Sequence, residues 1–333
     1  MTIQGYAALE AKAPLEAFAY EENGLGAYDA DIEISHCGVC HSDLHLLDGD
    51  WGRLSQYPLI AGHEIIGTIK AVGSAADANL VGKRVGVGWQ RGSCLTCEWC
   101  LSGQEELCSD HVGTCVGNYG GFAERVILDS RFAHVIPDGL ASDNAAPLLC
   151  AGITVFSPLM RYANSRSRVG VIGIGGLGHL ALQYANKMGC HVTAFSSSDA
   201  KKDEAMALGA HHYINGSDAD AMKKARRSCD LIIATAPANL DWGQYVRALR
   251  PNGTLCFVGI PNKPISVYAG QLQDNLQVVG SSIGGRYAMQ QMLEFSARHD
   301  IVAWTEQLPM DSVNTALDRL RDNDVRYRFV LEK

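Results

Sequence analysis

The sequence predicts an α/β protein of two domains, a barrel-like β domain and a domain built on a doubly wound parallel sheet. The chain has 333 residues, and at roughly 100–200 residues per domain this length suits about two domains. Short strand-like runs separated by Gly, Asp, Asn and Pro occupy residues 1–150, whereas strands alternate with helical stretches over residues 151–286. The first pattern is typical of β-barrels, and the second is typical of a parallel sheet covered by helices.

Charge and composition exclude several functional classes. Lys and Arg number 28 against 36 Asp and Glu, a net charge of −8, whereas a nucleic-acid binder needs a basic surface. No apolar run reaches the roughly 18 residues that suggest a membrane span. Residues Met1–Tyr6 show neither a basic nor an apolar segment of a signal peptide, and the cysteines number 11, an odd count. We therefore expect a cytoplasmic protein with metal-bound or buried thiols, and no membrane or nucleic-acid partner.

The first domain is expected to consist of short strands, and the second of alternating strands and helices. Strands of the first domain are predicted at Asp31–His36, Ile65–Val72 and Arg84–Gly88. The second domain is predicted to contain strands Arg168–Ile174, His191–Phe195, His212–Ile214, Asp230–Thr235 and Gly253–Gly259, and helices Leu177–Met188 and Lys201–Leu208. The tail is predicted to form helices Ala288–Arg298 and Met310–Arg321 and a closing strand, Tyr327–Glu332. That strand has no sequence neighbour to pair with, so it could return to the first domain.

Four cysteines spaced C-x2-C-x2-C-x7-C predict a structural metal site. They are Cys94, Cys97, Cys100 and Cys108. Four thiolates within such a short segment can surround one Zn²⁺ without leaving an open coordination position. An iron–sulfur cluster is the alternative, but ferredoxin runs place Pro after the last Cys, and Cys108 is followed by Ser109.

A second, dispersed set of residues predicts an open zinc site. Cys40, His63 and Cys150 would supply three protein ligands and leave the fourth position for water or substrate, as catalytic zinc requires. Each of these residues taken alone is more often an ordinary core residue. Asp43, three residues after Cys40, is suited to accept the other N–H of His63 and fix its tautomer.

A glycine-rich loop predicts dinucleotide binding. The G-x-G-x-x-G run comprises Gly173, Gly175 and Gly178, with Gly176 and Leu177 between the last two, and it follows a strand and opens a helix. The first glycine permits the turn, the second admits the pyrophosphate, and the third lets the helix pack on the strand.

The end of the next strand predicts NADP(H) rather than NAD(H). NAD enzymes usually place Asp or Glu there, on the ribose 2′-OH. This chain has Ser196, Ser197 and Ser198, with Lys201 close behind. Hydroxyls and a cation suit a 2′-phosphate that a carboxylate would repel, although Asp199 lies nearby.

Together these residues resemble the zinc-dependent alcohol dehydrogenases of the medium-chain dehydrogenase/reductase superfamily. The resemblance spans essentially the whole chain and includes the Gly62-His63-Glu64-x-x-Gly67-x5-Gly73 signature. The run Cys37–His45, the serine triplet and the ending Asp324–Val330 are similar to the cinnamyl-alcohol-dehydrogenase-like branch, which includes bacterial NADPH-dependent aldehyde reductases.

The resemblance implies a domain arrangement and a set of site residues. A GroES-like barrel would comprise 1–150 with 287–333, and a Rossmann domain would comprise 151–286. Cys40, His63 and Cys150 match the catalytic zinc ligands, with Glu64 nearby. Together with the closed site predicted from the spacing of Cys94, Cys97, Cys100 and Cys108, this gives two Zn²⁺ per chain. Ser42 and His45 match a proton relay. Further cofactor contacts are expected at Thr154, Val258, Ile260 and Arg326.

The implied function is hydride transfer between NADP(H) and a primary alcohol/aldehyde pair, acting as an aldehyde reductase. Trp51, and less directly Trp89, are candidates for a bulky pocket that suits medium-chain or aromatic substrates. The alternatives are an NAD-linked alcohol dehydrogenase of the same family, a zinc-independent quinone or enoyl reductase, and a binding protein that keeps the fold. Relatives dimerise through an edge strand, here near Leu276–Ile283, so a homodimer or homotetramer is expected.

Overall fold

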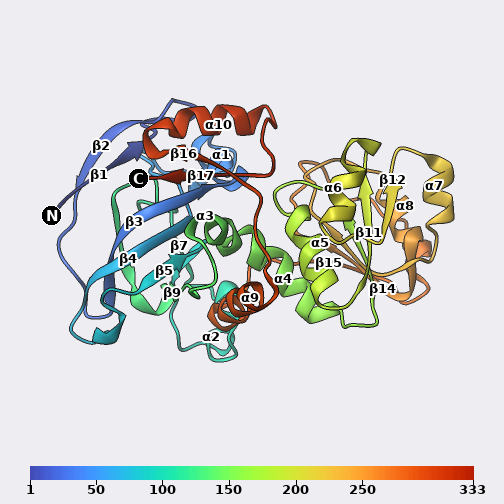
Figure 1. The fold of residues 1–333 in the computed structure, drawn as a ribbon, viewed down its shortest axis with the longest axis horizontal. Coiled ribbons are helices and arrows are strands. Elements are labelled where there is room, and N and C mark those ends of the chain that lie inside the picture. Colours follow the sequence, from blue (N-terminus) through green and yellow to red (C-terminus); the bar gives the residue numbers. More distant parts are fainter. The chain divides into compact units, whose positions relative to one another are not determined.

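The computed structural model describes residues 1–333, which fold into two compact units (Figure 1). The first unit comprises Met1–Cys150 and Gly284–Lys333, and the second comprises Ala151–Ile283. The first is built mainly of β-strands and the second of alternating strands and helices. The predicted α/β fold class is confirmed.

A seven-stranded sheet forms the centre of the first unit. Its strand order is β16-β17-β3-β4-β5-β9, with β8 paired to β3. The bounds are β3 (Asp29–Val39), β4 (Glu64–Val72), β5 (Arg84–Val87), β8 (Arg125–Asp129), β9 (His134–Val135), β16 (Thr305–Pro309) and β17 (Arg328–Glu332). Two smaller antiparallel pairs accompany it, formed by β1 (Thr2–Ala7) with β2 (Glu16–Glu21) and by β6 (Gln90–Gly92) with β7 (Val112–Gly113).

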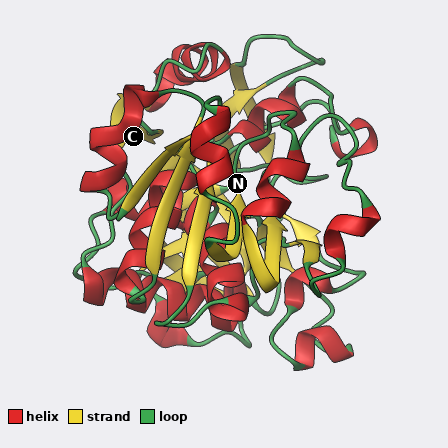
Figure 2. Cartoon of the chain, turned by 90° about the vertical axis from the view of Figure 1, so that its right-hand side faces the viewer, coloured by secondary structure: helices red, strands yellow, loops and turns green.

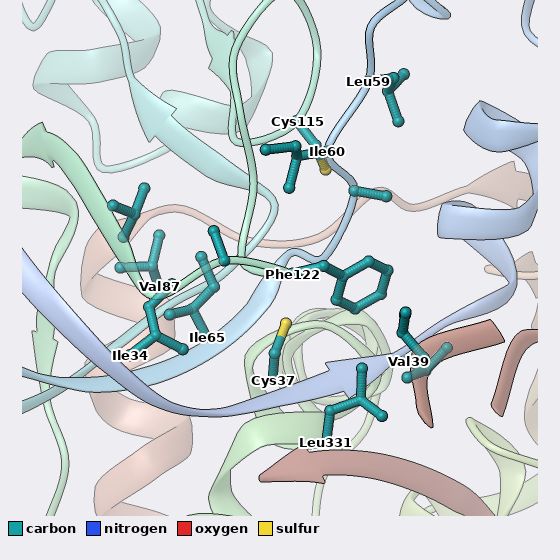
Figure 3. Packing of buried hydrophobic residues seen from close by; sticks show 14 of the residues in the cluster. Ile34, Cys37, Val39, Leu59, Ile60, Ile65, Val87, Cys115, Phe122 and Leu331 are labelled. Atoms are coloured by element: carbon teal, nitrogen blue, oxygen red, sulfur yellow. The ribbon is translucent and has the colours of Figure 1, made fainter. Parts of the chain in front are cut away.

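The core of this unit is shared by strands that are distant in sequence. Figure 3 shows Ile34 of β3, Ile65 of β4, Leu331 of β17 and Phe122 within one cluster of buried side chains. All four are at most 1% exposed. Full burial of such a side chain contributes about 1.5–3 kcal/mol to folding.

The closing segment of the chain completes the first unit. Strand β17 pairs antiparallel with β3, with Phe329 opposite Val39, and parallel with β16. Helix α10 (Val313–Arg321) buries Val313, Ala316, Leu317 and Leu320, the spacing of one helical face. Helix α9 (Arg286–His299) precedes these elements. The predicted closing strand thus pairs with one strand that is near in sequence, β16, and with one that is about 290 residues away, β3.

Short helices connect the strands of the first unit near the candidate site residues. They are α1 (His41–Leu47), η1 (Gly52–Leu54), η2 (Ala78–Leu80), α2 (Glu98–Leu101), η3 (Glu105–Leu107), η4 (Ser130–Phe132), α3 (Ser142–Ala145), η5 (Ala146–Leu149) and η8 (Met310–Ser312).

The second unit is a six-stranded parallel sheet in the order β12-β11-β10-β13-β14-β15. Figure 2, which faces this unit, shows its strands side by side with helices around them. The strands are β10 (Arg168–Ile172), β11 (His191–Ser196), β12 (His212–Asn215), β13 (Cys229–Ala234), β14 (Leu249–Phe257) and β15 (Gln277–Gly280). The helices are α4 (Ala151–Tyr162), α5 (Gly178–Lys187), η6 (Asp199–Lys201), α6 (Lys202–Ala207), α7 (Ala219–Lys224), α8 (Trp242–Ala248) and η7 (Ala269–Leu272).

The strand order reverses between β10 and β13. The chain runs outward from β10 to β12, then crosses back and runs outward from β13 to β15. In open parallel sheets, ligands bind beyond the carboxyl ends of the strands at such a switch point.

Some helices of the second unit were not predicted from the sequence. Helix α4 was missed because its first six residues are all buried and show no polar face to mark a helical period. The short helices α7 and α8 were not predicted either. No single helix in the chain combines the length and hydropathy needed to cross a bilayer, although the bent pair Ser142–Leu149 and Ala151–Tyr162 meets that test by length and composition alone.

Candidate catalytic metal centre and cofactor loop

Four buried side chains of the first unit converge on one point. The ligand atoms of Cys40, His63, Glu64 and Cys150 all lie within 4.8 Å of one another. Cys40 follows β3 at the start of α1, His63 and Glu64 stand where β4 begins, and Cys150 follows η5. These elements pack on one another because β3 pairs with β4 and η5 contacts both strands. The fold thus joins residues that are up to 110 positions apart.

Asp43 holds the histidine of this group in place. Its Oδ1 accepts hydrogen bonds from His63 Nδ1 at 2.8 Å and from the Gly62 N–H at 2.9 Å, and its Oδ2 accepts the Cys40 N–H at 2.9 Å. Because Nδ1 donates to Asp43, the free lone pair of neutral His63 is on Nε2. This atom is buried and has no hydrogen-bond partner. An unpartnered imidazole nitrogen beside two thiols fits a zinc ligand set.

The two thiols differ in acidity. The hydrogen bond from Cys150 is the largest cause that lowers the pKa of Cys40 well below its usual value, and Arg328 and His63 add to it. Conversely, the pKa of Cys150 is raised, first because it donates that bond and second because it is buried. Cys40 is therefore the more acidic thiol of the pair, and a bound cation would favour the thiolate form of both.

Glu64 forms a buried ion pair with an arginine that the sequence analysis did not select. Arg328 Nη2 contacts Glu64 Oε1, and the side chains are 4% and 0% exposed. Burial raises the pKa of Glu64 to about 7, although the Arg328 charge opposes this. The second oxygen, Oε2, is buried without a hydrogen-bond partner. Arg328 was missed because it sits in an apolar strand two residues after Arg326.

Arg326 itself lies against other partners. Its backbone N–H donates to Glu306 Oε1 at 3.1 Å, and its guanidinium carbon is 5.7 Å from the centre of the Tyr327 ring. The expected cofactor contact of Arg326 stays a prediction.

A row of rings leads away from His63. The Trp89 ring meets His63 edge-on at 5.0 Å between centroids, Trp51 meets Trp89 at 5.7 Å, and His45 stacks on Trp51 at 5.4 Å. His45 Nδ1 also lies 2.9 Å from Asp50 Oδ2, and its side chain is 42% exposed. Ser42 stands one turn before His45 on α1, so the two side chains share a helix face. Trp89, which the sequence indicated less directly than Trp51 as a pocket residue, is the tryptophan that contacts the candidate ligand His63.

Cys115 is a second residue that the sequence analysis did not select. It is 1% exposed, and its sulfur lies within 4.8 Å of ligand atoms of Asp43 and His63. No spacing pattern marks it, because its neighbours become adjacent only when the chain folds.

The four clustered cysteines form a separate group at the surface of the first unit. The sulfurs of Cys94, Cys97, Cys100 and Cys108 all lie within 4.8 Å of one another. Cys94 Sγ is 3.9 Å from Cys100 Sγ and 3.5 Å from Cys108 Sγ, close to the roughly 3.8 Å expected for sulfurs on one tetrahedral zinc. Hydrogen bonds from the segment Thr96–Cys97 lower the pKa of Cys94 to about 6. Both the spacing and the thiolate character fit a closed metal site.

The glycine loop of the second unit leaves room for a ligand. A Cβ at Gly178 would lie 1.8 Å from the Gly173 oxygen, and one at Gly173, whose φ is +87°, would lie 2.8 Å from the Ala236 Cβ. These two glycines are therefore required by packing. At Gly175, by contrast, a Cβ would meet nothing within 4 Å, which fits the close approach of a pyrophosphate.

Two side chains fasten this loop. Thr235 Oγ1 donates to the carbonyls of Ile172 and Gly173, both at 2.9 Å, and Lys201 Nζ donates to the Ile174 carbonyl at 2.7 Å. Thr235 was not selected from the sequence, because its role depends on β10 and β13 being neighbours. Lys201, predicted to bind the 2′-phosphate, therefore contacts the glycine loop, which is predicted to bind the pyrophosphate.

The remaining predicted cofactor residues are distributed around the same unit. Ser196 ends β11, and Val258 follows β14 at the same carboxyl edge of the sheet as the glycine loop. Ser197 and Ser198 are exposed, and so is Ile260, at 72%. Gly176 and Leu177 lead into α5, and Thr154 is buried in α4. Their contacts with a cofactor stay predictions.

Comparisons with known proteins agree with this architecture. The Alcohol dehydrogenase GroES-like domain family matches residues 26–138, and the Zinc-binding dehydrogenase family matches residues 176–298. The chain is 42% identical to the aldehyde reductase AdhA of Synechocystis sp. over 331 residues, covering 99% of this chain and 98% of that protein.

Solved structures extend the same likeness. A cinnamyl alcohol dehydrogenase of Sorghum bicolor superposes with a TM-score of 0.95 at 38% identity, covering 100% of this chain and 98% of that one. CAD from Helicobacter pylori, solved in complex with NADP(H), has a TM-score of 0.90 at 31% identity, covering 99% and 98%. The chain therefore belongs to the zinc-type alcohol dehydrogenases and aldehyde reductases of the medium-chain dehydrogenase/reductase superfamily, in the cinnamyl-alcohol-dehydrogenase-like branch.

Proposed function

We propose that this protein is an NADP(H)-dependent aldehyde reductase that acts on medium-chain or aromatic primary aldehydes and holds one catalytic and one structural Zn²⁺ per chain. The observation that carries the proposal is the buried set Cys40, His63 and Cys150, in which His63 Nε2 has no protein partner. A quinone or enoyl reductase of this fold that works without zinc would have no use for this set.

The chain's own residues divide the chemistry between them. Zinc bound by Cys40, His63 and Cys150 would supply Lewis-acid polarisation of the substrate carbonyl. Asp43 keeps the His63 ring in the tautomer that leaves Nε2 available. Bound NADPH would supply the hydride for the carbonyl carbon, and the carbonyl oxygen would then need a proton. We assign delivery of that proton to Ser42 and His45, since the side chain of His45 is partly exposed to solvent.

Preference for NADP(H) rests on the turn after β11. Three serines and Lys201 stand where an acidic side chain would select NAD(H). Lys201 is a partly buried cation whose Nζ already reaches the glycine loop. A further support is the relative of known structure that was solved with NADP(H).

Preference for bulky aldehydes rests on the two tryptophans. Trp89 packs on His63, and Trp51 packs on Trp89. Aromatic surface next to the metal ligands favours an apolar substituent on the aldehyde over the methyl group of acetaldehyde.

We also propose the compartment and the assembly. All eleven cysteines are free thiols, as in the reducing cytoplasm. Strand β15 lies at the edge of the parallel sheet, and an edge strand is a ready surface for pairing with a second copy. We assign a homo-oligomer formed through this edge.

The deciding experiment compares cofactors and aldehydes on the zinc-loaded protein. We expect kcat/KM to be higher with NADPH than with NADH, and higher with benzaldehyde than with acetaldehyde. Ser196→Asp should reverse the cofactor preference, because its carboxylate repels the 2′-phosphate. His63→Ala should abolish turnover while NADPH binding remains. A preference for NADH would favour the NAD-linked alternative, and full activity of zinc-free His63→Ala would refute the zinc mechanism.

A further inference from the structure

The turn that follows β11 is hydrogen-bonded to the segment that ends β12. Three consecutive carbonyls of this turn accept hydrogen bonds from that segment. The Gly216 N–H donates to the Ser196 oxygen at 2.6 Å, and Ser217 Oγ donates to the Ser197 oxygen at 2.9 Å. The hydroxyl of Tyr213 donates to the Ser198 oxygen. We call Tyr213, Gly216 and Ser217 the brace.

The hydroxyls of the same three serines remain unused. Ser198 makes no side-chain cap to the short helix that follows it, and the hydroxyls of Ser196 and Ser197 likewise hydrogen-bond to no other residue. With each carbonyl engaged toward the brace, the turn keeps its hydroxyl donors free for a ligand. A row of unengaged hydroxyls next to Lys201 suits a phosphate group.

The brace itself rests on a buried side chain. Tyr245 of α8 is 6% exposed, and a Cβ at Gly216 would lie 2.7 Å from its hydroxyl. Gly216 therefore packs closely against this buried side chain. On either side of Gly216, Asn215 Oδ1 accepts the Ser217 N–H at 3.0 Å. This hydrogen bond closes the turn that contains Ser217.

We propose that Tyr213 and Ser217 are positioning residues for cofactor selectivity, which set the serine turn in the conformation that receives the 2′-phosphate. This inference rests on the proposed NADP(H) preference and assigns part of it to two residues outside the serine triplet. Neither side chain is expected to touch the cofactor. Their hydroxyls act only through the carbonyls of Ser197 and Ser198.

The test measures equilibrium binding of NADPH and of NADH to the zinc-loaded enzyme by fluorescence. Tyr213→Phe and Ser217→Ala each remove one hydrogen bond and leave the packing of the hydrophobic core unchanged. We expect each to raise the Kd of NADPH about three- to tenfold, while the Kd of NADH changes less than twofold and kcat at saturating NADPH is unchanged. Ser217→Thr, which keeps a hydroxyl, should retain most of the selectivity.

Matched controls come from the same unit. Tyr268→Phe alters a side chain that is 78% exposed, and Ser228→Ala alters a serine that precedes β13. Both should bind NADPH like the wild type. Equal weakening of NADPH and NADH, or no change in either, would overturn the positioning role. A wild type that binds NADH as tightly as NADPH would instead remove the proposed cofactor preference, and this inference with it.

Discussion

Asp43 shows how much of the site depends on one side chain. It is 0% exposed, yet its two oxygens accept three hydrogen bonds, from His63, Gly62 and Cys40. These bonds fix the ring that would bind the metal, the backbone just before that ring, and the backbone of Cys40. A carboxylate that orients a zinc-binding histidine commonly contributes about 10–100-fold to metal affinity.

We therefore predict that Asp43→Asn weakens zinc binding at the catalytic site by about 10–100-fold. The amide lacks the charge and cannot accept all three hydrogen bonds through oxygen. Competition with a chelator, followed by metal analysis, measures the loss. Asp77→Asn, at an exposed helix start, serves as the control, and equal zinc retention in the two variants would contradict the prediction.

A second prediction at the residue scale concerns His134 and the dependence of the free energy of unfolding on pH. Burial first, and the Arg286 charge second, lower its pKa from 6.5 to about 4. Between those values the unfolded chain binds a proton that the folded chain does not, so stability is present above pH 6.5 and is lost as the pH falls toward 4.

Replacing this histidine should reduce the acid sensitivity. We expect His134→Asn to lose less unfolding free energy than the wild type between pH 7.5 and pH 5, as measured by denaturant titration. Loss of zinc in acid affects both proteins alike, so the difference between them reports His134. If the unfolding free energies of the two proteins changed in parallel with pH, His134 would not be neutral in the folded protein over this range.

At the scale of elements, the segment Cys94–Cys108, here called the cysteine lobe, contains only short helices and buries little apolar surface. Helix α2 has four residues, and η3 has three. Several of its apolar side chains face solvent, among them Leu101 at 77% and Leu107 at 45% exposed. A segment that buries so little apolar surface cannot offset the entropy of its own ordering.

We predict that Cys97→Ser loses one of two zinc equivalents per chain and makes the lobe a site of rapid proteolysis. Metal analysis after gel filtration and limited digestion measure the two effects. Cys190→Ser is the control, because Cys190 only donates a hydrogen bond to the Asn164 carbonyl and a serine can do the same. Two zinc equivalents in Cys97→Ser would show that the lobe is not a zinc site.

At the scale of the whole molecule, each unit carries a distinct part of the chemistry. The candidate metal ligands all belong to the first unit, and the glycine loop and the serine turn belong to the second. The second unit also has the edge strand β15, whose Val278 and Val279 are partly buried. We place the proposed contact between copies at this edge.

The assembly prediction follows from that strand. Val279→Lys adds a charge to the edge, which disfavours pairing of two strands. We expect a lower molar mass by light scattering, whereas Lys263→Glu, in the loop after β14, should leave the mass unchanged. An unaltered mass for Val279→Lys would place the interface elsewhere.

Local patterns in the sequence determined the element types, the parallel sheet and the residue types suited to zinc and to a dinucleotide. Each of these depends on neighbours within a few positions: alternating periods, cysteine spacing, glycines between a strand and a helix. An apolar segment with no polar face, such as α4, has no such local pattern and was therefore not predicted. Only the tertiary structure decided which distant residues meet. It placed Arg328 against Glu64, Cys115 beside His63, Thr235 on the glycine loop, and Tyr213 and Ser217 behind the serine turn. Those contacts depend on strand order and register, which burial and hydrogen bonding settle over the whole chain and no local spacing encodes.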